Sequence, residues 1–311
     1  MELVRGLVNL SEKHKNCVLT IGNFDGVHMG HQHVLNKLKT ESKKHGVPSA
    51  VMIFEPQPQE VFLGDKAAAR VLTFRDKFKK LEKLGIDRLI CVRFNKEFAG
   101  MAADEFIESL LVDKLGVKHL IVGDDFKFGV KRSGDFALLQ KESEICGFSV
   151  EDTKTFNYSD QRASSTAIRK YLQDADFKAA EDLLGEPFVM QGRVIHGQKN
   201  GRKFGFPTAN IAVKRKVLPI KGVFVVEVEL NNQTFYGVAN IGNKPTLNGV
   251  KPVLEVNIFN FDQQVYGQRL SIKPLSKIRS EQKFESIEQL ISQIKLDVAT
   301  AKSKLSQYGI K

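Results

Sequence analysis

The sequence has few cysteines, and their arrangement excludes several kinds of protein. The 311 residues include three cysteines, Cys17, Cys91 and Cys146, and none of them forms a Cys-x-x-Cys pair. A disulfide framework needs an even number of cysteines at regular spacings, and a structural zinc site needs paired thiolates. We therefore expect neither, and we expect the reducing environment of the cytoplasm.

Long apolar runs and blocks of like charge are also missing. No run approaches the roughly 18 apolar residues that a membrane helix needs, and Met1–Arg5 carries an acid and lacks the apolar core of a secretory signal. The net charge is +11, but the lysines and arginines are dispersed. Dispersed basic charge favours sites for polyphosphates over a nucleic-acid surface. We expect no membrane or nucleic-acid partner, and a monomer or weak homo-oligomer; RNA or DNA binding is the alternative.

The first half alternates strands and helices. We predict strands at 18–21, 49–54, 88–92, 119–122 and 148–151, and helices at 31–44, 73–84, 103–115, 134–144, 165–172 and 176–184. This alternation predicts a Rossmann-like α/β domain with a parallel sheet. Ligands bind such sheets at the carboxyl ends of the strands.

The pattern changes near residue 187, and the chain is long enough for a second domain. Short alternating runs occupy 188–195, 222–230, 233–239, 254–259 and 269–273, with turns predicted at 230–232 and 243–245. They predict an antiparallel barrel or sandwich, followed by an amphipathic helix at 286–307. We place the boundary near Gly185, which gives domains 1–184 and 185–311.

A glycine-rich turn joins the first predicted strand to the first predicted helix. It reads Gly22-Asn23-Phe24-Asp25-Gly26-Val27-His28-Met29-Gly30-His31. It has neither P-loop nor dinucleotide-binding spacing, so the histidines must supply something those loops lack. They could be structural, could bind a metal together with His33, or could donate to phosphate oxygens, with Asp25 fixing the turn or supporting a metal. The strand–helix junction favours phosphate, because free N–H groups and the helix dipole attract anions there.

A second group of polar residues lies at the start of a later helix. Ser164, Ser165 and Thr166 are flanked by Arg162 and Arg169. Hydroxyls at a helix start are often only N-caps. Here two guanidinium groups can join them around one anion. Two anion sites in one domain suggest chemistry between two phosphates.

These residues together resemble a known family. The pattern Gly22-x-Phe24-Asp25-Gly26-x-His28-x-Gly30-His31 with Ser164-Ser165-Thr166-x-Ile168-Arg169 resembles the HxGH nucleotidyltransferase superfamily. Phe54-Glu55-Pro56-x-Pro58 and Gly123-x-Asp125-Phe126-x-Phe128-Gly129 narrow the resemblance to the FMN adenylyltransferase module of prokaryotic FAD synthetases. The resemblance implies that the FMN phosphate attacks the α-phosphorus of ATP and that pyrophosphate leaves. Catalysis would consist of positioning and charge stabilisation.

The same resemblance implies roles for individual residues. His28 and His31 would be catalytic. The residues implied to bind ATP and its phosphates are Gly22, Asn23, Phe24, Asp25, His28, His31, Arg162, Ser165, Thr166 and Arg169. The residues implied to line the flavin or nucleotide pocket are Phe54, Pro56, Pro58, Asp125, Phe126 and Phe128. Lys127 stands where the family often has arginine.

Two features of the second half suggest further phosphate chemistry. Thr208 and Asn210 point the same way on an extended segment, so a hydroxyl and an amide oxygen could share one Mg²⁺ ion. The Gly/Lys/Arg-rich loop at 197–205 could also be a simple exposed hairpin. Glu255 lies among apolar and neutral strand residues. It could face solvent, or it could be a general base beside a hydroxyl substrate.

This half resembles riboflavin kinase throughout. The resemblance rests on Gly205-x-Pro207-Thr208-Ala209-Asn210, on the segment from Gly237 to Thr246, on Glu255, on Tyr266-Gly267 and on the segment from Ile278 to Phe284. It implies a six-stranded barrel in which Glu255 deprotonates the ribityl 5′-hydroxyl for attack on the γ-phosphate of ATP. Asn257 stands where the family often has histidine.

The kinase resemblance implies residue roles as well. The nucleotide loop would comprise Gly197, Gly205, Phe206, Pro207, Thr208 and Asn210, with Mg²⁺ held by Thr208 and Asn210. Arg279 and Glu281 would lie on the flavin side. Both motif sets together imply a bifunctional enzyme that makes FMN and then FAD from riboflavin and two ATP. An enzyme that retains only one of the two activities is the alternative.

Overall fold

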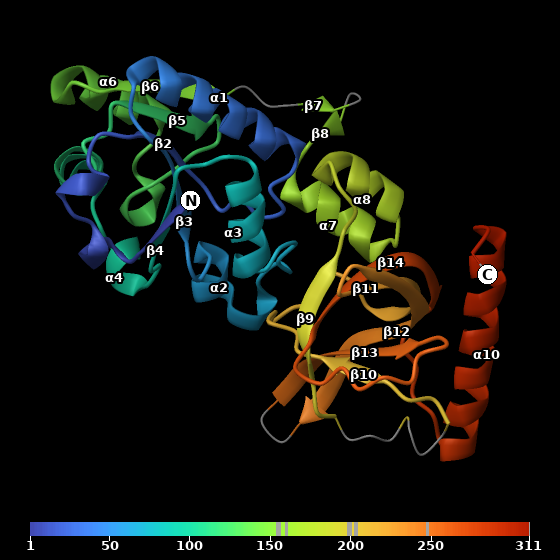
Figure 1. Cartoon of the computed structure of the whole chain (residues 1–311). Coiled ribbons are helices and arrows are strands. Elements are labelled where there is room, and N and C mark those ends of the chain that lie inside the picture. Colours follow the sequence, from blue (N-terminus) through green and yellow to red (C-terminus); the bar gives the residue numbers. More distant parts are fainter. Residues whose placement is uncertain (154–156, 159–160, 198–200, 202–204, 247–248, 311) are drawn as a thin grey trace. The chain divides into compact units, whose positions relative to one another are not determined.

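The computed structural model describes residues 1–153, 157–158, 161–197, 201, 205–246 and 249–310 (Figure 1). The chain divides into two compact units. The first comprises Met1–Ala68 and Leu72–Ser165, and the second comprises Ala69–Val71 and Thr166–Lys311. Within the described ranges, every helix is too short or too polar to cross a lipid bilayer.

The first unit is built on a six-stranded sheet in which all neighbouring strands are parallel, as predicted (Figure 1). Its order is β1-β4-β3-β2-β5-β6. Five of the strands were predicted, whereas β1, a four-residue edge strand, was not. The strands are β1 (Glu2–Arg5), β2 (Val18–Ile21), β3 (Ser49–Phe54), β4 (Arg88–Val92), β5 (His119–Gly123) and β6 (Ser149–Thr153).

Helices cover both faces of this sheet because successive strand side chains point in opposite directions. Val18 packs with Leu35 and Leu38 of α1, whereas Leu19 packs with Ile107 on the other face. The helices are α1 (Met29–His45), α2 (Pro58–Leu63), α3 (Phe74–Lys83), α4 (Lys96–Ala99), α5 (Ala103–Glu105) and α6 (Phe136–Cys146). The helix predicted at 103–115 is mostly π-helical, over η4 (Phe106–Lys114). Short 3₁₀ turns occupy η1 (Leu7–Asn9), η2 (Glu12–His14), η3 (Gly64–Lys66) and η5 (Val130–Arg132).

The strand order places a crevice beside β2. The chain passes from β2 to β3 on one side, and β5 pairs with β2 on the other. Such a reversal leaves a gap at the carboxyl ends of the two diverging strands, where ligands of open α/β sheets bind. The turn after β2 and the loop after β5 therefore meet at one edge of the sheet.

The second unit contains a closed barrel of six antiparallel strands, which decides between the predicted barrel and sandwich (Figure 1). Its order is β10-β13-β12-β11-β14-β9. Alternate residues such as Phe224, Val226 and Val256 fill the interior. The strands are β9 (Met190–Ile195), β10 (Ala209–Ile211), β11 (Gly222–Leu230), β12 (Gln233–Thr246), β13 (Gly249–Ile258) and β14 (Arg269–Arg279). A two-stranded ribbon, β7 (Asn157–Tyr158) with β8 (Gln161–Arg162), precedes this unit in the chain.

One predicted turn was right and one was wrong. Asn231 and Asn232 both have positive φ and form the tight turn between β11 and β12. Residues 243–245 are not a turn, because β12 continues through them. Asn243 pairs with Pro252 and Lys244 pairs with Lys251 across β13. Cross-strand pairing therefore overrides the turn preference of Asn and Pro here.

Among the described residues, the helices that accompany the barrel include α7 (Ser165–Gln173), α8 (Phe177–Leu184) and α10 (Ile287–Gln307). The ring of Phe177 in α8 contacts the ring of Phe224, with centroids 5.9 Å apart. Ala301 and Leu305 of α10 pack with Val225 on the outer face of the barrel. The final helix predicted from its apolar stripe is thus confirmed.

Candidate functional site

A cavity of about 870 Å³ lies in the first unit, at the predicted edge of the sheet. The turn after β2 and the loop after β5 form much of its wall. The lining residues that the sequence predicted are Gly22, Asn23, Phe24, Asp25, His28, His31, Phe54, Pro58, Asp125, Phe126, Phe128, Arg162 and Ser165. Polar and aromatic residues predicted from separate motifs therefore share one cavity.

The turn after β2 has an unusual backbone. Phe24, Gly26 and Val27 have φ of 46°, 90° and 43°. A left-handed conformation costs free energy for a β-branched residue such as valine, so surrounding contacts must hold it in place. Asp25 supplies one of these contacts, because its Oδ1 accepts a hydrogen bond from the backbone N–H of Leu72 at 3.2 Å. The aspartate therefore helps to fix the turn.

Two lysines that the sequence analysis missed also hold this turn. Lys77 Nζ donates to the carbonyl oxygen of Asn23 at 2.5 Å, and Lys80 Nζ donates to that of Gly26 at 3.3 Å. Lys77 is only 1% exposed. The sequence does contain an indication that Lys77 is buried, because this lysine interrupts the apolar stripe of the predicted helix between Phe74 and Leu81. Buried lysines are rare unless they are paired.

His28 caps α1 and is thereby fixed in one protonation form. Its Nδ1 accepts a hydrogen bond from the backbone N–H of His31 at 3.3 Å. An Nδ1 that accepts cannot carry a proton, so Nε2 of the neutral ring carries it and can donate. Gly30 leaves room for this arrangement, since a Cβ there would lie 3.2 Å from both His28 Nδ1 and the Ala163 carbonyl oxygen.

His31 stacks on His28 and is uncharged near neutrality. The ring centroids are 3.6 Å apart. Burial lowers the pKa of His31 well below 6.5, and the charges of Lys77 and Lys80 lower it further. As a neutral ring it has one N–H donor.

Two buried atoms of this turn have no hydrogen-bond partner within the described part of the chain. They are Nδ1 of His31 and Oδ1 of Asn23. Burying a polar atom without a partner costs about 1–3 kcal/mol. Both residues line the cavity, so a polar ligand there would satisfy them. The alternative of a metal bound by His28, His31 and His33 finds no support, because among the described residues only Glu41, His45 and His119 form a metal-like group.

The polar residues around α7 divide between the two units. In the first unit, Ser165 Oγ donates to the carbonyl oxygen of Asp25 at 2.7 Å, and Arg162 Nη2 lies 3.7 Å from Asp124 Oδ1. Thr166 and Arg169 belong to the second unit, where Arg169 Nε donates to the carbonyl oxygen of Ala69 at 2.7 Å. The predicted phosphate contacts of Thr166 and Arg169 stay predictions.

An aromatic wall lines the first cavity. The rings of Phe54 and Phe94 meet edge-on at 5.6 Å, and those of Phe126 and Phe128 stack at 5.6 Å. Pro56 is not among the lining residues and follows a cis peptide bond after Glu55. Sequence reasoning missed four aromatic members: Phe62, Phe94, Phe98 and Phe106. They lie in segments without a distinctive motif, so only the fold gathers them.

A second cavity of about 420 Å³ lies on the outer face of the barrel, with side chains of α10 in its wall. Glu255 of β13 lies directly opposite Asn210 of β10 and Asn240 of β12. Its neighbours Leu254 and Val256 point into the barrel and are buried. The alternation therefore places Glu255 on the outer face of the barrel, as the solvent-facing alternative predicted. On that face, Glu255 lines a cavity together with Thr208 and Asn210.

The predicted nucleotide loop is partly described. Phe206, Thr208 and Asn210 line the cavity. The Asn210 amide packs directly against Gly197, where any Cβ would collide with it. Asn257 Nδ2 donates to the carbonyl oxygen of Pro207 at 2.7 Å, so the residue that departs from the family pattern tethers this loop. Gly205 has a φ of 83°. Residues 198–200 and 202–204, which include Arg202 and Lys203, lie outside the described residues.

Arg279 and Glu281 also line the second cavity. Arg279 forms a two-pronged ion pair with the buried Asp297 of α10, at 2.9 Å from Nε to Oδ1 and 2.8 Å from Nη2 to Oδ2. The carboxylate of Glu281 packs directly against Gly242, where a Cβ would collide with it. Arg279 therefore holds α10 beside the cavity.

Comparisons with known proteins match both halves of the chain to described families. A family model described as FAD synthetase matches residues 10–167, and one described as riboflavin kinase matches residues 184–305. A bifunctional riboflavin kinase/FMN adenylyltransferase from Haemophilus influenzae is 51% identical over 304 residues, which cover 97% of this chain and 99% of the relative. The chain belongs to the bifunctional riboflavin kinase/FMN adenylyltransferase family.

Other members and a solved structure extend the comparison. The relative of the same name from Escherichia coli K12 is 48% identical over 97% of both chains. A crystal structure described as a macrolide-efflux protein from Streptococcus pneumoniae is 29% identical, with a TM-score of 0.78. It covers 96% of this chain and 97% of its own, so the fold extends over nearly the whole length.

Proposed function

We propose that this member of the family phosphorylates riboflavin to FMN in the barrel cavity and adenylylates FMN to FAD in the cavity of the parallel sheet. We assign adenylyl transfer to residues 1–184 and the kinase to residues 185–311. The observation that carries the proposal is that one chain holds two cavities, each with its own set of predicted polar residues. His28 and His31 line the first, and Glu255 with Thr208 and Asn210 lines the second.

In adenylyl transfer, the residues of the turn position and stabilise phosphates. An FMN phosphate oxygen attacks the α-phosphorus of ATP, and the bond to the pyrophosphate oxygen breaks. The Nε2–H of His28 and the N–H of neutral His31 donate to phosphate oxygens on which charge shifts during transfer. Ser165, Thr166 and Arg169 hold the departing pyrophosphate, with Arg162 in support. The aromatic wall of Phe54, Phe126 and Phe128 stacks the flat ring of the substrate.

In the kinase step, Glu255 accepts the proton of the ribityl 5′-hydroxyl while that oxygen attacks the γ-phosphorus of ATP. Thr208 Oγ1 and Asn210 Oδ1 are neutral oxygen donors beside this carboxylate, a donor set that fits Mg²⁺ completed by phosphate and water oxygens. Bound Mg²⁺ would neutralise charge on the phosphates. Arg279 and Glu281 line the side of this cavity at which the flavin binds.

Product analysis tests the proposal directly. The full chain is incubated with riboflavin, ATP and Mg²⁺, and the flavins are separated by chromatography. We expect FMN and FAD, and we expect FAD alone when FMN is supplied. Failure to form either product would refute the proposal, whereas FMN without FAD would show that only the kinase is active. Omitting Mg²⁺ is expected to stop both reactions.

We also propose a cytoplasmic monomer or weak homo-oligomer whose partners are ATP and flavins rather than nucleic acid or membrane. The scattered cysteines and dispersed basic charge support this proposal. The alternative of an RNA- or DNA-binding protein predicts affinity that falls steeply with salt. A retardation assay with both nucleic acids over a salt series distinguishes the two, and size-exclusion chromatography reports the oligomeric state.

A further inference from the structure

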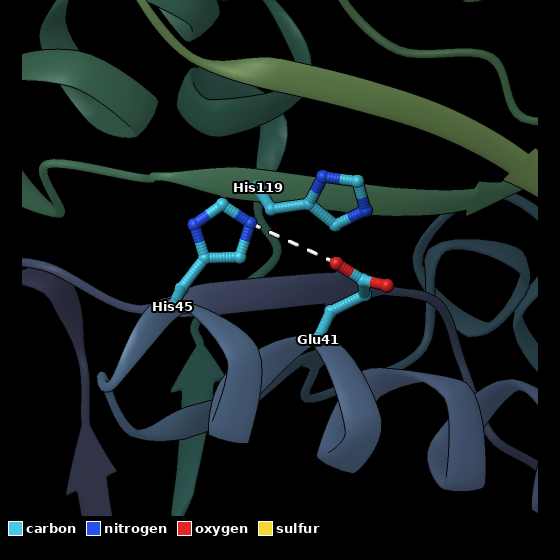
Figure 2. Close-up of side chains that lie close together, drawn as sticks. All are labelled: Glu41, His45 and His119. Carbon is cyan, nitrogen blue, oxygen red and sulfur yellow. Dashed lines mark ion pairs between the residues drawn. The ribbon is translucent and has the colours of Figure 1, made fainter.

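A group of three metal-binding side chains lies in the first unit outside the cavity already described. Glu41 and His45 are four residues apart on the last turns of α1, and His119 is the first residue of β5 (Figure 2). One ligand atom from each side chain lies within 4.8 Å of those of the other two. Figure 2 shows both imidazoles beside the carboxylate of Glu41, which lies 3.7 Å from His45 Nε2. The three residues form what we call the α1–β5 cluster.

His119 is the most buried member of the cluster, at 8% exposed, and one of its ring nitrogens has no hydrogen-bond partner among the described residues. Its Nδ1 lies 2.6 Å from Ser149 Oγ, and that hydroxyl donates to the carbonyl oxygen of Lys118 at 3.2 Å. When that hydroxyl donates to Lys118 it accepts from His119, and Nδ1 of His119 then carries the proton. Nε2 then presents a lone pair. This Nε2 is buried and has no hydrogen-bond partner among the described residues.

Such an arrangement is the usual setting of a histidine that binds a metal. The second ring nitrogen donates to an oxygen acceptor, which fixes the tautomer and aims the lone pair. A neutral imidazole is the form that coordinates metals.

The surroundings contain charges of both signs. Glu151 Oε2 lies 3.7 Å from His119 Nε2, and Lys37 pairs with the same glutamate at 2.5 Å. Lys44 Nζ lies 3.2 Å from Glu41 Oε2 but is 72% exposed. A divalent cation would replace this ammonium on Glu41. It would also sit at the carboxyl end of α1, where the helix dipole favours positive charge.

We propose that the α1–β5 cluster binds one first-row divalent cation of the Zn²⁺ type through Glu41, His45 and His119. Glu151 or water completes four-coordination. Zinc–nitrogen bonds of about 2.1 Å place tetrahedral ligand atoms about 3.4 Å apart. The present ligand atoms lie within 4.8 Å of one another, so they must approach by up to about 1.4 Å, which rotation about the side-chain bonds of Glu41 and His45 allows.

The position of the cluster indicates a structural metal. His119 and Ser149 begin β5 and β6, so they lie at the amino edge of the sheet, opposite the cavity. The same helix α1 carries His28 at its other end. A metal here would pin α1 to the sheet and stabilise the platform on which His28 and His31 are held. This inference is independent of the proposed reactions.

Co²⁺ titration of the full chain tests the proposal, after treatment with a chelator and without nucleotide or flavin. We expect one equivalent of Co²⁺ to give the visible absorption bands of a four-coordinate site, and Zn²⁺ to abolish them. His45→Gln, on the accessible side of the cluster, should weaken Co²⁺ binding by about tenfold or more. His196→Gln removes a histidine from the second unit and is the matched control. Lys44→Gln should strengthen binding, because it removes the competing ammonium.

Thermal unfolding supplies a second measurement. Zn²⁺ in excess should raise the melting temperature of the wild-type chain and of His196→Gln, and should raise that of His45→Gln by less. Circular dichroism of the metal-free variants shows that each is folded. The proposal is overturned if no four-coordinate bands appear, or if His45→Gln binds Co²⁺ as tightly as the control variant does.

Discussion

His28 Nδ1 accepts a hydrogen bond from the backbone N–H of His31 at 3.3 Å, and the two rings stack at 3.6 Å. One contact thus caps α1, leaves the proton of His28 on Nε2 and brings the second histidine beside the first. The unpartnered Nδ1 of His31 and Oδ1 of Asn23 lie in the same turn. The turn is therefore organised before any ligand binds, which is what stabilisation of shifting phosphate charge requires.

Replacing His28 separates its capping role from its catalytic role. Asparagine is a good N-cap but has no imidazole, so His28→Asn should keep the helix while FAD formation from FMN falls about 10²–10³-fold. His28→Ala should lose the same activity and also about 1 kcal/mol of stability. Assays with FMN as the only flavin, together with urea unfolding, measure both effects. Unchanged FAD formation in His28→Asn would contradict the assignment.

Replacing Glu255 should affect only the kinase reaction. Glu255→Gln retains the size of the side chain but cannot accept a proton, so FMN formation should fall about 10²–10⁴-fold. FAD formation from supplied FMN should persist. Glu227→Gln, on the outer face of β11 and paired with Lys273 at 3.7 Å, is the control. If Glu255→Gln abolished both reactions, the two-site assignment would be wrong.

Lys77 should be required for the shape of the glycine-rich turn after β2. Lys77→Met preserves the apolar stem but leaves the carbonyl oxygen of Asn23 without its ammonium donor, which costs about 1–3 kcal/mol. Because Asn23 would then shift, FAD formation should fall about tenfold or more. Lys79→Met, on the exposed side of the same helix, should change neither property. Steady-state kinetics and denaturant unfolding of both variants provide the comparison.

The ion pair between Arg279 and Asp297 should set the position of α10 beside the kinase cavity. Asp297→Asn leaves the Arg279 guanidinium without its charge partner in a largely buried setting, at a cost of about 3 kcal/mol. We expect a lower melting temperature and a higher KM for riboflavin, with FAD formation from FMN unaffected. Lys295→Gln, exposed on α10, is the control. A normal KM in a destabilised Asp297→Asn would show that the pair acts on stability alone.

The buried histidines predict how stability depends on pH. The pKa values of His31 and His119 are lowered below 6.5 in the folded chain, so the unfolded chain binds these protons more readily. The free energy of unfolding should therefore not depend on these two histidines above about pH 6.5. Below that pH it should decrease as the pH falls, by up to about 1.4 kcal/mol per pH unit for each histidine. Urea unfolding between pH 7 and 5 should show this slope. His31→Gln should flatten it, and an unchanged slope would count against the burial of His31.

Much of the architecture follows from local patterns. Short, continuous apolar runs predicted five strands of the parallel sheet, and the apolar stripe at 286–307 predicted α10. The errors arose where pairing overrides local preference. Residues 243–245 have turn composition but lie within β12, and the edge strand β1 is too short for a recognisable pattern. The motifs around His28, Thr208 and Glu255 could be recognised because glycines and polar residues interrupt apolar segments there.

The sequence alone determined the two-part organisation, the glycine-rich turn after the first strand and the family, because these depend on periodicity and on residues close together in the chain. Only the tertiary structure decided which distant residues join them. It placed Lys77 under the turn, gathered the aromatic wall, closed the barrel and set Glu255 opposite Asn210. It also brought His119 to Glu41 and His45. These relationships depend on strand order and register, which are set by packing across the whole domain and leave no local trace in the sequence.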